Sequence, residues 1–125
     1  MRPILIVEDN DKNLKLVRDV LRFKGYTTIE AMTAEEGLRL ARQELPALIL
    51  MDIQLPDFDG ITALKRLRAD ELMRETPVLA VSASAMPDDR QKIIASGFND
   101  YITKPIDILR LIETVERFIG KAPKQ

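Results

Sequence analysis

The chain has 125 residues, a formal net charge of −1 and 46% hydrophobic residues. This length suits one domain with a hydrophobic core, and the near-neutral charge gives no general attraction to nucleic acid or to an anionic membrane. Cysteine and histidine are both absent, which excludes disulfides, thiolate zinc sites, Ser-His-Asp catalysis and cysteine or histidine nucleophiles. The sequence shows no signal-peptide pattern and no apolar stretch of about 18 residues. We therefore expect a cytoplasmic protein whose chemistry depends on carboxylates, hydroxyls, lysine or arginine.

Short apolar runs alternate with longer amphipathic stretches along the chain. The predicted strands are 4–7, 27–31, 48–51, 78–81 and 100–103. A helix is predicted after each strand, with Thr33 and Asp107 capping the second and fifth helices, Pro87 in the first turn of the fourth, and the third over 60–69. Gly37 lies inside the second helix, where glycine is disfavoured by about 1 kcal/mol relative to alanine. Such alternation predicts a parallel sheet with helices on both faces.

The composition of the strands predicts their order. The first, third and fourth are continuous apolar runs, as expected for strands covered on both faces, whereas the second and fifth are mixed, as edge strands usually are. This pattern fits the order 2-1-3-4-5 of flavodoxin-like folds. We therefore predict an α/β fold with a doubly wound, five-stranded parallel sheet over residues 1–120 and a short flexible tail at 121–125.

Polar residues follow the predicted strands at the end where each strand stops. Glu8 and Asp9 follow the first strand, Asp52 the third, Ser82 the fourth and Lys104 the fifth. The carboxyl ends of parallel strands share one edge of an open sheet, and ligands bind there at the point where the strand order reverses. That point lies between the first and third strands, so the acids that follow these two strands should be neighbours in space.

The charges at this edge indicate a divalent cation. Three acids and one lysine leave two negative charges uncompensated, which one Mg²⁺ would balance with the oxygen ligands that it prefers. The metal and Lys104 would then hold a phosphoryl group, and Ser82 would offer it a hydroxyl. One carboxylate would act as nucleophile, and Asp52 is the best candidate because it lies at the centre of the edge.

Four short motifs at these positions resemble a known family. They are VEDN at 7–10, MDIQLPDFDG at 51–60, VSA at 81–83 and TKP at 103–105. In this order, each after a strand, they resemble the response-regulator receiver domain (CheY-like) of two-component signalling over about residues 3–119. The segments ILIVEDN and LILMDIQLP are most similar to stand-alone receivers of the DivK type, which govern cell-cycle phosphorelays.

The resemblance implies a role for each residue at this edge. Asp52 would be the phosphoacceptor, and Lys104 would pair with the phosphoryl group. Asp9 would bind Mg²⁺ directly, Glu8 would bind it through water, and the backbone carbonyl of Gln54 would be a further ligand.

The resemblance also implies a switch next to the phosphoacceptor. Ser82 would be the switch hydroxyl and Tyr101 the switch aromatic. Pro105 would follow Lys104 through a cis bond that aims the lysine inward. The side chains of Gln54 and Ser84 would tune the lifetime of the phosphoryl group.

The function implied is that of a single-domain response regulator. A sensor histidine kinase or a histidine phosphotransfer protein would phosphorylate Asp52, and the fourth helix, fifth strand and fifth helix would then bind a downstream protein. We expect no attached output domain after residue 119, no nucleic acid or membrane partner, and a monomer or a phosphorylation-dependent dimer. Apart from self-phosphotransfer and autodephosphorylation, no enzymatic activity is expected.

Three other functions remain open at this point. A small Mg²⁺-dependent phosphatase with an aspartyl nucleophile would need a cap or substrate pocket that 125 residues hardly provide. A flavodoxin-like FMN carrier would need a hydroxyl- and glycine-rich loop after the first strand, where the sequence is EDNDKN. A degenerate receiver used as a scaffold would have lost an acid or the lysine, and none is lost.

Other charged residues have an ordinary structural interpretation. Asp57 and Asp59 are interpreted as loop and helix-cap residues. Lys65, Arg66 and Arg68 are interpreted as one solvated helix face rather than a binding patch.

Overall fold

The computed structural model describes residues 2–57, 59–83 and 86–122. Its strands are β1 (Ile4–Val7), β2 (Thr28–Ala31), β3 (Leu48–Asp52), β4 (Val78–Ser82) and β5 (Asp100–Thr103). Its helices are α1 (Asp11–Phe23), α2 (Ala34–Glu44), α3 (Gly60–Ala69), α4 (Pro87–Ala95) and α5 (Ile108–Ile119). All strand pairs are parallel and the order is β2-β1-β3-β4-β5, so the predicted topology is confirmed. Among the described residues, no helix has the length and apolar character needed to cross a membrane.

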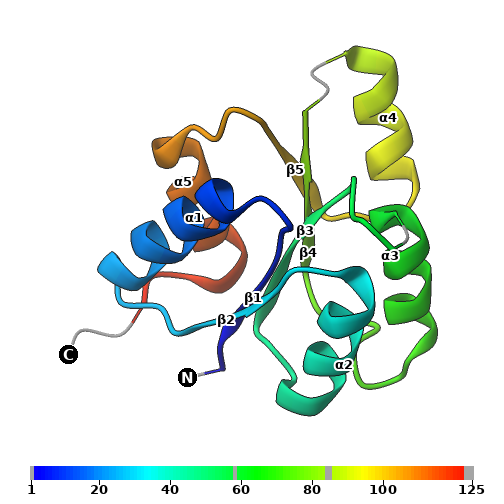
Figure 1. Cartoon of the computed structure of the whole chain (residues 1–125), viewed down its shortest axis with the longest axis horizontal. Coiled ribbons are helices and arrows are strands. Elements are labelled where there is room, and N and C mark those ends of the chain that lie inside the picture. The colour runs from blue at the N-terminus through cyan, green and yellow to red at the C-terminus, as the bar shows by residue number, and fades with distance from the viewer. Residues whose placement is uncertain (1, 58, 84–85, 123–125) are drawn as a thin grey trace.

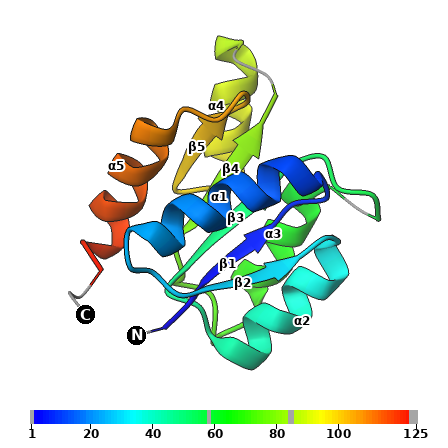
Figure 2. The ribbon, with the colours of Figure 1, turned by 60° about the vertical axis from the view of Figure 1, so that its left-hand side comes forward.

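Helices cover both faces of the sheet. Figure 1 shows α1 and α5 on one side and α2, α3 and α4 on the other, and the turned view in Figure 2 shows α1 lying in front of the sheet. Along β1, Ile4 and Ile6 pack into the core cluster beneath α1 and α5, whereas Leu5 and Val7 pack into the cluster beneath α2, α3 and α4. Burial on both faces is the reason why β1 is a continuous apolar run.

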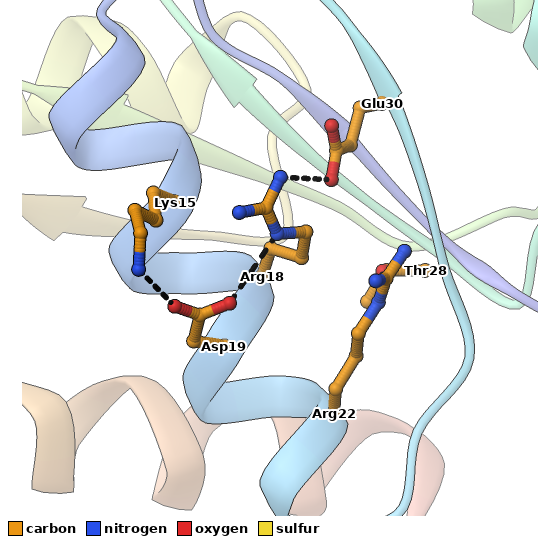
Figure 3. A network of polar contacts seen from close by, with 6 residues as sticks. All are labelled: Lys15, Arg18, Asp19, Arg22, Thr28 and Glu30. Atoms are coloured by element: carbon orange, nitrogen blue, oxygen red, sulfur yellow. Dashed lines mark hydrogen bonds and ion pairs between the residues drawn. The ribbon is translucent and has the colours of Figure 1, made fainter.

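The edge strand β2 is held to α1 by polar side chains, which Figure 3 shows. Arg18 Nη1 on α1 lies 3.2 Å from Glu30 Oε1 on β2. Arg22 Nε on the same helix donates to Thr28 Oγ1 over 2.8 Å. Each such contact, at least partly open to solvent, stabilises the fold by about 1 kcal/mol or less. These contacts explain why β2 has a mixed composition, because its outer positions face polar partners rather than a core.

Gly37 is required by the close packing of α2 on the sheet. A Cβ atom at this position would lie 2.8 Å from Val7 Cγ2 and 3.1 Å from Val7 Cγ1. Real Cβ atoms do not approach a neighbour so closely, so a side chain here would push α2 away from β1. The helix-breaking residue that the sequence analysis noted is therefore explained by contact between α2 and β1.

Arg68 has a structural role that the sequence analysis did not predict. The interpretation of Lys65, Arg66 and Arg68 as a solvated face is wrong for Arg68, which is half-buried. Its guanidinium donates to the carbonyls of Arg74 and Thr76 over 3.0 and 2.7 Å, and to Asn99 Oδ1 over 2.8 Å. Burial lowers the pKa of Arg68. This side chain therefore ties α3 to the turn before β4 and to the turn before β5.

Replacing Arg68 should destabilise the fold measurably. We expect Arg68→Ala to lower the free energy of unfolding by about 1–3 kcal/mol, because the partly buried bond to the Thr76 carbonyl and the exposed bonds to Arg74 and Asn99 lose a charged donor. Lys65→Ala is the matched control on the same helix, where an exposed side chain should change stability by about 0.5 kcal/mol or less. Urea denaturation measures both variants. Equal, small effects would show that the Arg68 contacts do not contribute to stability.

Candidate functional site

Acidic side chains from the ends of two central strands meet at one edge of the sheet. Glu8 and Asp9 directly follow β1, and Asp52 is the last residue of β3. Val7 lies opposite Met51 in the parallel pairing of β1 with β3, so the residues that follow them emerge side by side. Carboxylate oxygens of the three acids all lie within 4.8 Å of one another. The expectation that these acids are neighbours is therefore confirmed.

Lys104 supplies a positive charge to this cluster. Its Nζ lies 2.9 Å from Asp52 Oδ2 and 3.1 Å from Glu8 Oε1. Asp52 and Glu8 are only 3% and 4% exposed, whereas Asp9 is exposed. Burial alone would lower the pKa of Lys104, but hydrogen bonds to Asp52 and Glu8 outweigh it and leave the pKa raised. Lys104 is thus held in its charged form against two buried carboxylates.

Burial makes Glu8 hold a proton more tightly than an exposed carboxylate does. Burial and the hydrogen bond to Asp52 raise the pKa of Glu8 to about 7, against the opposing effect of Lys104. One lysine therefore does not compensate the acids at this edge. A further cation would stabilise the charged form of these carboxylates and displace the proton from Glu8.

The loop after β3 folds back onto Asp52. The backbone N–H of Gln54 donates to Asp52 Oδ1 over 2.9 Å, while the Gln54 side chain is exposed. The N–H of Gly60 donates to the carbonyl of Ile53 over 2.8 Å. A Cβ atom on Gly60 would lie 2.8 Å from the carbonyl oxygen of Asp52, a backbone atom that cannot move aside easily. Glycine at position 60 therefore allows α3 to begin in close contact with the backbone of Asp52, the candidate phosphoacceptor.

Ser82 lies on β4, the strand that pairs with the one ending in Asp52. It is the buried last residue of β4, and Asp52 pairs with Val81 in the register of β3 and β4. Its carbonyl accepts the backbone N–H of Lys104 over 2.8 Å, and the Lys104–Pro105 peptide bond is cis. The structure thus brings Ser82 and Lys104 to the same edge as the acids. The predicted contribution of Ser84 lies outside the described residues.

Tyr101 lies farther out, on the edge strand β5, and is half-buried. Two arginines contact its ring, with the Cζ of Arg90 at 4.8 Å and that of Arg110 at 5.9 Å from the ring centroid. Arg110 also donates to the Tyr101 carbonyl over 3.2 Å. Neither arginine could be predicted from the sequence, because they come from α4 and α5 and meet only through the fold.

Asp57 and Asp59, interpreted from the sequence as loop and helix-cap residues, accept N–H groups at the start of two different helices. Asp59 accepts the N–H of Thr62 over 2.7 Å and caps the helix that follows it, α3. Asp57 accepts the N–H groups of Ala34 and Glu35, each over 2.9 Å, and so caps α2. No local pattern around Asp57 indicates this second helix.

Comparison with known proteins identifies the family. The pattern of the response regulator receiver domain matches residues 4–116. The chain belongs to the response regulator receiver domain family. Receiver domains are signalling modules of two-component systems, and they typically interact with histidine kinases.

Similar receivers are found among both sequences and solved structures. The polar-differentiation response regulator DivK of Brucella ovis is 46% identical over 121 residues, which cover 97% of this chain and 98% of DivK. A putative response regulator from Chloroflexus aurantiacus is 31% identical, with a TM-score of 0.90 and coverage of 96% of this chain and 98% of that one. The receiver domain of a sensor histidine kinase from Pseudomonas aeruginosa is 35% identical, with a TM-score of 0.87 and the same coverage. Its structure contains a magnesium ion coordinated in the active site cleft.

The raised pKa of Glu8 predicts how the stability of this receiver depends on pH. Without divalent cations, the folded state keeps the Glu8 proton up to about pH 7, whereas the unfolded chain loses it near the ordinary glutamate pKa of 4.5. The contribution of Glu8 to stability is therefore fully present below about pH 4.5 and is lost as pH rises from there to about 7. We expect urea denaturation in EDTA to show a loss of about 1–3 kcal/mol that is specific to Glu8. Glu8→Gln should flatten that part of the profile, and parallel profiles for the two proteins would contradict the assignment.

Proposed function

We propose that this receiver is a phosphorylation switch with Asp52 as its phosphoacceptor. A phosphohistidine of a sensor histidine kinase or of a histidine phosphotransfer protein, or a small phosphodonor, would supply the phosphoryl group. The observation that carries the proposal is the convergence of Glu8, Asp9 and Asp52 within 4.8 Å, with Lys104 Nζ 2.9 Å from Asp52.

The acids at this edge fit a magnesium ion. They offer hard oxygen ligands, two of them are buried, and the one lysine leaves them undercompensated. Asp9, Asp52 and the backbone carbonyl of Gln54 would hold Mg²⁺ directly, and Glu8 would hold it through water. When bound, the ion would neutralise charge on the transferring phosphoryl group.

Several residues of the chain would each have a separate role in the transfer of the phosphoryl group. A carboxylate oxygen of Asp52 would form the new O–P bond while the P–N bond to the donor histidine breaks and the imidazole leaves. The Gln54 N–H and Lys104 Nζ already donate to Asp52, and so they fix the direction of its carboxylate. After transfer, Lys104 would donate to a phosphoryl oxygen, and the Ser82 hydroxyl would donate to another.

The output would be a change on the α4–β5–α5 surface. As Ser82 moves toward the phosphoryl group, the ring of Tyr101 would turn inward, and phosphorylation would favour that state energetically. Arg90 and Arg110 contact the ring, so its movement would also change where these two charges lie. A downstream protein or a second copy of the receiver would read this surface, with no turnover of an external substrate.

The proposal predicts which carboxylate becomes phosphorylated. Incubation with acetyl phosphate and Mg²⁺ should add one phosphoryl group to the wild-type protein, measured as intact mass. Asp52→Asn should gain none, because an amide cannot form the acyl phosphate. Asp59→Asn is the matched control, since this nearby acid caps α3 and should not be required for labelling. Labelling of Asp52→Asn at the wild-type level would mean that Asp52 is not the nucleophile.

A further inference from the structure

The carboxylate of Asp57 joins two segments that are distant in the sequence. It lies in the loop between β3 and α3, and its two oxygens accept the N–H groups of Ala34 and Glu35 at the start of α2. The N-cap of α2 itself, Thr33, accepts the N–H of Glu36 over 3.1 Å. A residue from another loop thus satisfies two of the first N–H groups of this helix, and its negative charge is favourable at a helix N-terminus.

The loop that Asp57 holds is the one that carries Gln54. Near β3 this loop is fixed by the bond from the Gln54 N–H to Asp52, and Leu55 packs against the core. At its other end Asp59 caps α3. Asp57 lies between these two points and joins the middle of the loop to the start of α2. It therefore adds a restraint that the contacts at the two ends of the loop do not provide.

Helix α2 is in turn fixed to the strand that presents the other acids. Gly37 on α2 packs so closely on Val7 that no Cβ fits between them. Val7 is the last residue of β1 and directly precedes Glu8 and Asp9. A path of contacts therefore links the two parts of the site through α2. It runs from the loop that carries Gln54 through Asp57 and α2 to Val7, and so to the acids that follow β1.

We propose that Asp57 is a positioning residue for the metal site. It would fix the distance between the Gln54 carbonyl and the acids after β1, and so hold the ligands in place before the ion arrives. This inference rests on the proposed function, because it takes the Gln54 carbonyl as a ligand. Preorganised ligands bind more tightly because less conformational freedom is lost on binding, and groups that orient ligands from outside commonly change metal affinity by about 10–100-fold.

A simple helix cap would have a different signature. If Asp57 only stabilised α2, its loss would lower stability without a specific effect on metal binding. Thr33→Ala is the matched control, because it removes a cap bond from the same helix end and leaves the loop connected through Asp57. Asp57→Asn tests the charge and the second acceptor, because an amide keeps one oxygen acceptor.

The experiment measures the Mg²⁺ dissociation constant by calorimetry, together with stability in urea. We expect Asp57→Ala to weaken Mg²⁺ binding by roughly tenfold and Asp57→Asn by less. Thr33→Ala should lose stability but keep the wild-type dissociation constant. In the wild type without Mg²⁺, the backbone amides of Ala34 and Glu35 should exchange slowly with solvent, because Asp57 already accepts their hydrogen bonds, and Asp57→Ala should make this exchange faster.

The outcomes separate the inference from the function that it builds on. Wild-type Mg²⁺ affinity in Asp57→Ala, or an equal weakening in Thr33→Ala, would overturn the positioning role while the proposed function stands. Rapid exchange of the Ala34 and Glu35 amides in the wild type without Mg²⁺ would overturn it too, even if a variant fails to fold, because the connection would then not be formed in advance. If the wild type itself binds no Mg²⁺, the proposed function fails first.

Discussion

The site depends on carboxylates that the fold buries beside one another. Glu8 and Asp52 are almost completely buried at the end of neighbouring strands, and Asp9 lies beside them. Lys104 pairs with both buried acids, yet the pKa of Glu8 still rises to about 7. Carboxylates kept in this way are unfavourable without a second cation, and this is the physical reason why the edge is suited to a metal and a phosphoryl group.

The rest of the fold keeps these groups in place. Strands buried on both faces give the sheet a rigid centre, and the tight contact of Gly37 with Val7 fixes α2 against it. Arg68 fastens the turns at the opposite end of the sheet, where β4 and β5 begin. Tyr101 is different, because it is half-buried on an edge strand and touches exposed arginine side chains. The site is thus held rigidly, while the surface proposed to signal is held by contacts that can rearrange.

The sequence predicted those features that follow from periodicity and strand order. Continuous apolar runs mark the central strands, and parallel strands bring Asp9 and Asp52 to one edge. The prediction failed where a side chain acts across the fold on a partner that its own neighbours do not indicate. Arg68 reads as one more basic residue on a helix, and Asp57 as one more loop acid, since only the tertiary structure brings their partners to them. The contacts of Tyr101 with two arginines were unpredictable for the same reason.

The most direct measurement is a crystal structure of the receiver grown with a saturating concentration of Mg²⁺. We expect one ion at the acidic edge, coordinated by Asp9, Asp52 and the carbonyl of Gln54 at about 2.1 Å, with Glu8 reached through water. An empty edge at saturating Mg²⁺ would contradict it. So would an ion bound elsewhere while Glu8, Asp52 and Lys104 keep their present contacts.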